Sequence, residues 1–441
     1  MKTKRLLPLN TLLILIAFLR SRLAAGKLAA RLGVVFLLVG GLSHGAYAQY
    51  PVRGIVRDKE TKEPLPFVGI GVKGTTMGTA SNENGEFTLS LPSVPQTLIF
   101  SELAHIKDTV QVTQAGQALE IELAPATVVL SEVKVASYAY QLVDRAYQQL
   151  KKNYSRKFYG KAYYRQITRI DNDPTELLEM VWNAKSNIAR IEGTSIAQGR
   201  YAAKQALISD KNFSLYTKSF GLYDDKADTT KALGLFSPNV VANYLLEIKG
   251  VLEKGETGGV AEIAFETRPE QTKYRSKGTV WIDVDTYQVI RYKMTTPQLT
   301  RKANNPTFSF KNTELELDMV FQNDTTAVNP LEHIKADMTY DLVRPGLPPA
   351  KMKVSAFTFF YDTSRKPTSL TYNKVTSNER DLETIRKVKY DPEFWANNPV
   401  VKRTPLEDEV AKSFEQKGAF GTMVKKPEPK ADVRIRNGRI E

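Results

Sequence analysis

Hydrophobic and polar residues alternate in short runs between residues 51 and 135, and a turn signal recurs about every ten residues. Phe87–Leu91 alternates strictly, as expected of a strand with one buried face. Asn84-Gly85 precedes it, and both residues accept the positive φ of a tight hairpin turn. The other predicted strands are 52–56, 65–72, 79–82, 97–100, 109–112 and 119–123. Short strands without helical periodicity predict an N-terminal antiparallel β-sandwich.

The hydrophobic period changes to that of a helix at Tyr138–Tyr154. Leu142, Ala146 and Leu150 recur every four residues, so they lie on one face, while polar residues occupy the other. This segment is predicted to be a helix that connects the sandwich to a second domain.

Strand-like alternation returns after Phe158, in longer runs that are rich in Tyr, Phe, Thr and Val. The predicted strands are 161–170, 177–182, 187–191, 260–267, 278–284, 287–295, 308–321, 333–340 and 351–361, with a helical or mixed stretch at 237–246. Such strands with a few helices predict a larger curved antiparallel sheet or half-barrel. The predicted fold class is therefore mainly β.

Thr404-Pro405-Leu406-Glu407 has the T-x-x-E spacing of a capping box with proline at the first helical position. A short helix is predicted to begin there. Residues 425–441 are rich in proline and charge and are predicted to form a disordered tail.

The first 48 residues have the features of a secretory signal peptide. They contain seven Lys or Arg residues and no acidic residue. Two apolar runs, Leu6–Leu19 and Leu32–Leu42, are each shorter than the ~20 residues that cross a bilayer. Ala46-Tyr47-Ala48 provides a small-x-small cleavage site before Gln49. An uncleaved N-terminal anchor is the alternative.

The predicted domains follow from these boundaries, and a chain of 441 residues has room for two or three domains at roughly 150 residues each. They are a signal peptide at 1–48, a β-sandwich at 49–136, a connecting helix at 137–154, a β-rich half-barrel-like domain at 155–424 and a tail at 425–441. No transmembrane span is predicted in the mature chain.

Net charge argues against nucleic acid as a partner. The whole chain carries +14, and the seven positive charges of residues 1–48 leave +7 on the mature chain. That is a mildly basic surface, without a compact run of five Lys or Arg residues.

Residues 52–92 resemble the carboxypeptidase-regulatory-like domain, which has a prealbumin-like sandwich. Ser81-Asn82 departs from the family's usual Thr-Asp. The resemblance implies an accessory module without a catalytic zinc, as in the N-terminal extension of TonB-dependent receptors. The matching positions are Gly54, Asp58, Pro64, Leu65, Val68, Gly74, Thr75, Gly78, Thr79, Gly85 and Phe87.

Two shorter segments also resemble envelope proteins. Lys277–Arg291 is similar to the strand–turn–strand repeat of periplasmic lipoprotein carriers, with Asp283 and Asp285-Thr286 at the turn. That resemblance implies a concave apolar face that holds a lipid or peptide chain, and a fully packed core is the alternative. Residues 390–423 resemble the end of a soluble segment in Bacteroidetes-type surface proteins.

Few residues offer catalytic chemistry. The chain has no cysteine, and after residue 48 its histidines are His105 and His333, which are interpreted as structural. No zinc motif, G-x-S-x-G elbow, phosphate loop or dinucleotide fingerprint occurs. Asp224-Asp225 and Asp228 lack the spacing of a calcium loop. No catalytic, cofactor-binding or metal-binding residue is therefore predicted, and no cofactor.

The sequence favours an exported cell-envelope protein that binds a ligand or acts as a scaffold without catalytic activity. The expected location is the periplasm or the outer-membrane surface, and the candidate partners are envelope proteins, glycan and lipid. Two alternatives remain: an envelope hydrolase that uses Asp/Glu carboxylates, and a carrier of lipid or another apolar ligand.

Overall fold

The computed structural model describes residues 50–129, 136–203, 212–229, 231–253, 259–270, 275–297, 307–322, 328–376, 379–397, 400–416, 420, 435–436 and 439–440. The predicted signal peptide lies outside these residues, as does most of the predicted disordered tail. The described part of the tail is a pair of two-residue antiparallel strands, β19 (Ile435–Arg436) and β20 (Arg439–Ile440). The chain from Tyr50 onward forms one compact unit.

The N-terminal module is a sandwich of two small sheets, with strand orders β4-β1-β7 and β3-β2-β5-β6. Its core lies between them, and the rings of Phe87 and Phe100 meet edge to face across it at 5.6 Å. All pairs are antiparallel except β1 with β7. The strands are β1 (Tyr50–Asp58), β2 (Gly69–Val72), β3 (Gly78–Ala80), β4 (Glu86–Leu91), β5 (Gln96–Ser101), β6 (Asp108–Val112) and β7 (Ala118–Leu123).

The prediction of a strand over 65–72 is wrong in its first half, because β2 begins at Gly69. Pro64 and Pro66 have no N–H to donate to a ladder. Phe67 has a left-handed backbone, with φ 58°. Its ring leaves the sandwich and stacks on Phe357 of the large sheet, with the ring centroids 4.9 Å apart.

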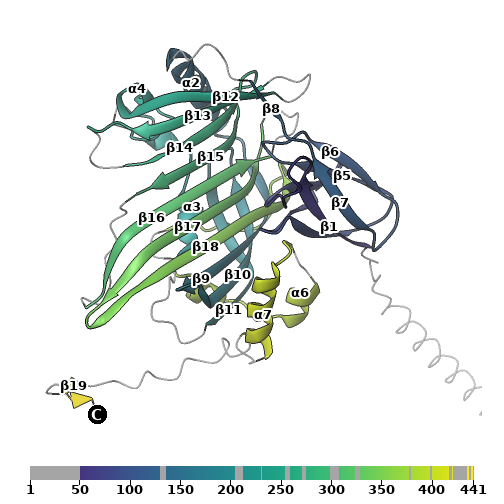
Figure 1. Cartoon of the computed structure of the whole chain (residues 1–441), viewed down its shortest axis with the longest axis vertical. Helices are drawn as coiled ribbons and strands as arrows, with labels where there is room; N and C mark the ends of the chain where they lie inside the picture. The colour runs from purple at the N-terminus through teal and green to yellow at the C-terminus, as the bar shows by residue number, and fades with distance from the viewer. Residues whose placement is uncertain are drawn as a thin grey trace, which may run out of the picture. The chain divides into compact units, whose positions relative to one another are not determined.

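The second module is an eleven-stranded sheet in the order β11-β10-β9-β18-β17-β16-β15-β14-β13-β12-β8, with antiparallel neighbours throughout (Figure 1). The predicted mainly β fold with a larger curved antiparallel sheet is confirmed. The strands are β8 (Thr127–Val129), β9 (Phe158–Ile170), β10 (Asp173–Ser186), β11 (Ile191–Ala203), β12 (Tyr244–Glu253), β13 (Gly259–Thr267), β14 (Lys277–Asp283), β15 (Val289–Thr296), β16 (Ser309–Phe321), β17 (Leu331–Arg344) and β18 (Leu347–Ser364).

The predicted strand at 187–191 is wrong, since these residues turn the chain from β10 into β11. The side chain of Asn187 accepts hydrogen bonds from the backbone N–H groups of Ala189 and Arg190, at 2.9 Å each. An asparagine that bonds its own following backbone stabilises a turn and competes with strand pairing.

One face of the large sheet, here called the inner face, is covered by the chain's own apolar side chains. The predicted helix is present as α2 (Ala136–Asn153), which packs against β12 and β14. Leu142 and Ala146 of α2 join Trp182 and Met338 of the sheet in one buried cluster. The remaining helices are α3 (Ser214–Ser219), the 3-10 helix η1 (Asp225–Ala227), α4 (Val240–Asn243), α5 (Asp381–Ile385), α6 (Pro392–Asn397) and α7 (Pro405–Gln416). Among the residues described, no helix has both the length and the apolar content of a membrane span.

Candidate functional site between the sandwich and the sheet

The sandwich contacts the opposite, outer face of the large sheet. Tyr292, Met319 and Ile334 on neighbouring strands are buried in the inner-face cluster. Because side chains alternate along a strand, the adjacent Arg291, Asp318 and His333 project from the outer face. Phe67 of the sandwich packs beside His333, with ring centroids 6.2 Å apart.

A C-terminal segment, residues 400–408 (the strap), joins the two modules. Thr79 of β3 donates a hydrogen bond of 2.6 Å to the carbonyl of Val400. Asn82 of the sandwich donates one of 3.2 Å to the carbonyl of Arg403. On the sheet side, Arg165 of β9 donates one of 2.8 Å to the carbonyl of Val401. The strap therefore holds the sandwich against the sheet.

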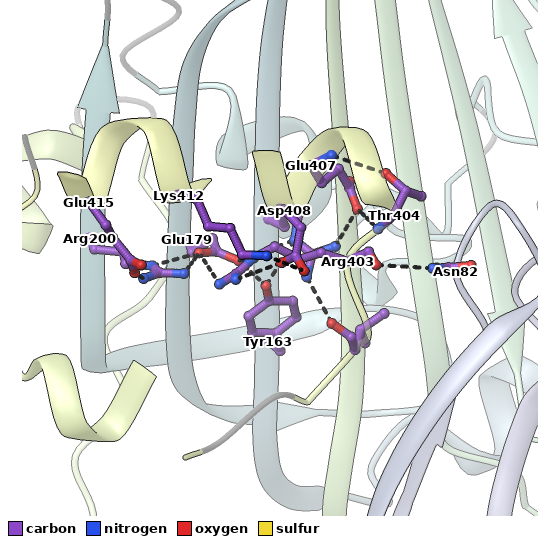
Figure 2. A network of polar contacts seen from close by, with 12 residues as sticks. Asn82, Tyr163, Glu179, Arg200, Arg403, Thr404, Glu407, Asp408, Lys412 and Glu415 are labelled. Atoms are coloured by element: carbon purple, nitrogen blue, oxygen red, sulfur yellow. Dashed lines mark hydrogen bonds and ion pairs between the residues drawn. The ribbon is translucent and has the colours of Figure 1, made fainter. Parts of the chain in front are cut away.

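Beneath the strap lies a buried carboxylate, Glu179 of β10, surrounded by donors (Figure 2). It accepts hydrogen bonds from Arg200 at 2.6 Å, Arg165 at 3.2 Å, Arg403 at 3.2 Å and the hydroxyl of Tyr163. Burial alone would raise the pKa of Glu179, but the arginines hold it below its ordinary value. These contacts therefore favour the ionised form of Glu179, and its partners are structural.

Helix α7 supplies further carboxylates to the same arginines. Glu407 pairs with Arg165 at 3.0 Å and Glu415 with Arg200 at 2.8 Å. The predicted capping box is confirmed, because the backbone N–H of Thr404 donates to Glu407 at 2.8 Å and that of Glu407 donates to the Thr404 hydroxyl at 3.2 Å. Glu407 therefore caps α7 and fixes it to the sheet at once.

A row of alternating charges also crosses the junction between the sandwich and the sheet. His105 contacts Asp58 through Nε2 at 2.9 Å and Glu102 through Nδ1 at 2.6 Å. The other oxygen of Glu102 lies 3.9 Å from Nη1 of Arg291 in β15. Arg291 in turn donates two hydrogen bonds to Asp318 of β16, at 2.9 and 2.6 Å. We call these five residues the charge chain.

The contacts within the charge chain favour its ionised forms. The pKa of Asp58 is lowered to about 2 by the backbone N–H of Thr61 and by His105. Glu102 and Asp58 raise the pKa of His105, although burial opposes them. Burial likewise opposes ionisation of Glu102, yet its bond to His105 keeps the pKa low. His105 is consequently a cation between two anions.

A cleft of about 290 Å³ lies between the sandwich and the sheet, and we call it the junction cleft. Its rim includes the exposed Pro66, Ala104 and Lys107, while Leu103 and His333 are buried in its floor. The loop 101–107, strand β15, strand β16 and strand β17 each contribute part of the lining. Its polar lining residues are Ser101, Glu102, His105, Lys107, Arg291, Asp318, Glu332, His333 and Lys335.

The structure brings His105 and His333 to the same cleft, although they lie in different modules. Sequence reasoning treated both as structural and assigned no site residue. The lining comes from two parts of the sequence, residues 65–107 and residues 290–335, which no local motif connects. The sequence signal is modest. Each histidine has a carboxylate nearby in the sequence: Glu102 lies three residues before His105, and Glu332 directly precedes His333.

The other carboxylates singled out in the sequence have local partners. Asp224 pairs with Arg190, and Asp228 with Lys151 and Tyr147. Asp283 accepts hydrogen bonds from Asp285 and Thr286 within the predicted hairpin turn. Across the described ranges, no group of three or more His, Asp or Glu side chains is arranged to hold a metal.

A second, apolar hollow of about 250 Å³ opens beside the inner face, and we call it the rim pocket. Phe220, Leu235, Phe236 and Tyr292 form much of its wall. The hydroxyl of Tyr244 in the same wall donates to a backbone carbonyl at 2.9 Å. Charged side chains do not line this pocket in the part of the chain that is described.

Residues 52–135 match the family model of the CarboxypepD_reg-like domain, which confirms the predicted resemblance for the sandwich. A solved DUF1329 family protein from Desulfovibrio piger aligns at 9% identity over 54% of this chain and 96% of that chain, with TM-score 0.21. OprB of Pseudomonas putida, in its low-pH structure, aligns at 9% identity over 48% and 94%, with TM-score 0.12. Both scores are too low for these likenesses to bear on fold or function. No curated protein matches the chain.

Proposed function

We propose that this chain, which contains a CarboxypepD_reg-like domain, is an exported protein of the bacterial cell envelope that binds a ligand in the junction cleft without transforming it. The envelope assignment is supported by the domain at residues 52–135 and by the signal-peptide features of residues 1–48. The binding role is supported by one observation, the cleft between the two modules. The strap and the charge chain connect these modules through hydrogen bonds and ion pairs.

The charged groups of the cleft support binding over catalysis. Both ring nitrogens of His105 contact carboxylates, so neither is left to take a proton from a ligand. A glycoside hydrolase needs two carboxyl groups that flank the bond it cleaves. Here Asp318 is paired with Arg291, and Glu102 lies between Arg291 and His105, so both carboxylates already face cations of the protein.

Export is tested by fractionating cells that express the full chain from its own start codon. We expect the protein in the envelope fraction, with Gln49 as its first residue by N-terminal sequencing. Intact protein in the cytosol would overturn the envelope assignment.

Binding is tested with the protein purified from that fraction and three pools extracted from the envelope: glycan fragments, peptides and lipids. Ala104→Trp places an indole in the mouth of the cleft and removes no charged group. Ala118→Trp puts the same side chain on an exposed position of β7 and is the matched control. Native mass spectrometry should detect a ligand from one pool bound to the wild-type protein. Ala118→Trp should bind the same ligand, and Ala104→Trp should not. If no pool yields such a ligand, the proposed function is wrong.

The rim pocket favours a second candidate function, the transport of an apolar ligand. Its wall of aromatic and aliphatic side chains suits an alkyl or aromatic group. Leu233→Trp, at a half-exposed wall residue, should then displace a copurified lipid, whereas Ala104→Trp should not. A protein that carries no lipid as purified, and takes up none from the lipid pool, would exclude this candidate.

A further inference from the structure

We propose that the junction cleft takes a neutral polyhydroxylated ring, a single sugar unit of an envelope glycan. The inference rests on the proposed binding function and names its ligand class. It is carried by three properties of the cleft: balanced charge, a gap in the charge chain that suits a hydroxyl group, and an apolar wall.

Charge in the cleft is balanced. The lining contains three anions, Glu102, Asp318 and Glu332, and four cations, His105, Lys107, Arg291 and Lys335. Asp58 lies 2.9 Å from Nε2 of His105 and supplies the fourth anion. Arg291 already donates two hydrogen bonds to Asp318. A charged ligand that contacted Arg291, Glu102 or Asp318 would have to separate these ion pairs and leave a partly buried charge without its partner. The free-energy cost of that separation exceeds the gain from the new contact.

The charge chain contains one gap of a suitable size for a hydroxyl group. Nη1 of Arg291 and Oε1 of Glu102 are 3.9 Å apart, too far for a direct hydrogen bond. A hydroxyl group is both donor and acceptor, so one hydroxyl accepts from Arg291 while it donates to Glu102.

Glu332 provides a further acceptor. Its carboxylate lies 3.2 Å from Nδ1 of His333, and its side chain is 13% exposed. A carboxylate has about four lone-pair sites, and one contact leaves most of them for a ligand's hydroxyl groups.

Apolar side chains complete the cleft. Leu65 and Leu103 of the sandwich, together with Ile290 and Val320 of the sheet, line it beside the polar groups. A sugar ring has hydroxyl groups around its edge and C–H groups on its faces, so it fits a site with one polar and one apolar wall. The volume of about 290 Å³ lies just below the ~300–1,000 Å³ typical of ligand pockets, which favours a single ring.

A peptide fits the same site less well. Extended peptides are commonly bound by adding a strand to a free sheet edge. Strands β5, β15, β16 and β17, which border the cleft, each have a paired neighbour on both sides. No strand edge among these four is available to a peptide.

The experiment uses methyl glucoside, methyl galactoside, methyl mannoside and N-acetylglucosamine as neutral probes, with glucuronate and glucosamine as charged rings of the same size. Saturation-transfer NMR with the purified protein measures binding. We expect at least one neutral probe to bind, with the charged rings at least about fivefold weaker, a ratio that corresponds to about 1 kcal/mol. Failure of all four neutral probes, or tighter binding of a charged ring, would overturn the inference.

Three variants locate the site. Ala104→Trp should abolish the signal, Ala118→Trp should retain it, and Glu332→Gln should weaken it about fivefold through the lost charge-assisted hydrogen bond. Thermal unfolding checks that each variant is folded. If Glu332→Gln does not fold, the comparison of Ala104→Trp with Ala118→Trp alone tests whether the sugar binds in the cleft. Sugar binding that persists in Ala104→Trp contradicts the assignment. If the cleft excludes sugars but binds a peptide or lipid that Ala104→Trp blocks, this inference fails while the binding function stands.

Discussion

His105 Nδ1 lies 2.6 Å from Glu102 Oε2, and this contact places a cation behind the carboxylate that faces the large sheet. The same carboxylate approaches Arg291 across the junction. A local turn of the sandwich therefore extends into a row of charges that reaches β16, and the row borders the junction cleft.

Replacing His105 by glutamine should remove a pH-dependent part of the stability. Since the folded-state pKa of His105 is raised, its contribution is complete below the ordinary imidazole value of about 6.5 and is lost as pH rises through the raised value. The lowered pKa values of Asp58 and Glu102 add stability above about pH 4 that is lost as pH falls. The wild-type advantage in urea unfolding should be greatest near pH 5–6.5, at about 1–3 kcal/mol.

The wild-type advantage over His105→Gln should shrink by pH 9. An advantage that stays constant from pH 5.5 to pH 9 would contradict an imidazolium between these carboxylates. Lys59→Gln changes an exposed charge nearby and serves as the control.

Glu179→Gln should destabilise the protein strongly, by about 3–5 kcal/mol, because it leaves the arginines around it without their buried anion. Glu415→Gln is the matched control, since that carboxylate is 46% exposed and should cost about 0–1 kcal/mol. Equal losses in the free energy of unfolding for the two variants, measured with denaturant, would show that the contribution of Glu179 does not depend on its burial.

Thr404→Ala should loosen the start of α7. The change removes the hydroxyl that accepts the Glu407 N–H, and loss of an N-cap costs about 1 kcal/mol. Backbone amides of α7 should exchange with solvent about fivefold faster. Thr404→Ser keeps the hydroxyl, and its amides should exchange at the wild-type rate. Equal exchange rates in the two variants would show that the hydroxyl cap does not stabilise α7.

Gly69→Ala should disturb the junction cleft without unfolding the sandwich. A Cβ at this position would lie 2.9 Å from the carboxylate oxygens of Glu332, so the carboxylate must move. Its side chain is flexible, and the loss of stability should stay below about 1 kcal/mol. Gly71→Ala in the same strand meets nothing within 4 Å and is the control.

Ligand capture by Gly69→Ala should fall several-fold relative to Gly71→Ala in the native mass spectrometry assay. Undiminished capture would mean that Glu332 does not contact the ligand.

Much of the fold is predictable because its signals are local. The Asn84-Gly85 turn, the Leu142–Leu150 stripe of α2 and the Thr404–Glu407 capping box each lie within a few residues of sequence. The errors also have local causes. No strand is predicted at β12, although its positions alternate between buried and exposed. Leu245 is an exposed apolar residue among its polar positions and obscures this alternation in the sequence.

The site was not predictable in the same way. Arg165 and Glu407 are 242 residues apart, and their pairing depends on how β9 and α7 meet. Phe67, which lines the cleft, likewise stacks on Phe357 of the large sheet, far away in the sequence. Hydrophobic periodicity predicts strands and their buried faces, but it does not predict which face of the large sheet the sandwich contacts.

The central claim, that the junction cleft is the ligand site, is tested most directly by hydrogen–deuterium exchange of the full protein with and without the pooled envelope extract. We predict slower exchange at residues 101–107 and 331–335 when ligand is present, and unchanged exchange at 220–236. Slower exchange at 220–236 alone, or no change in any segment, would contradict the account.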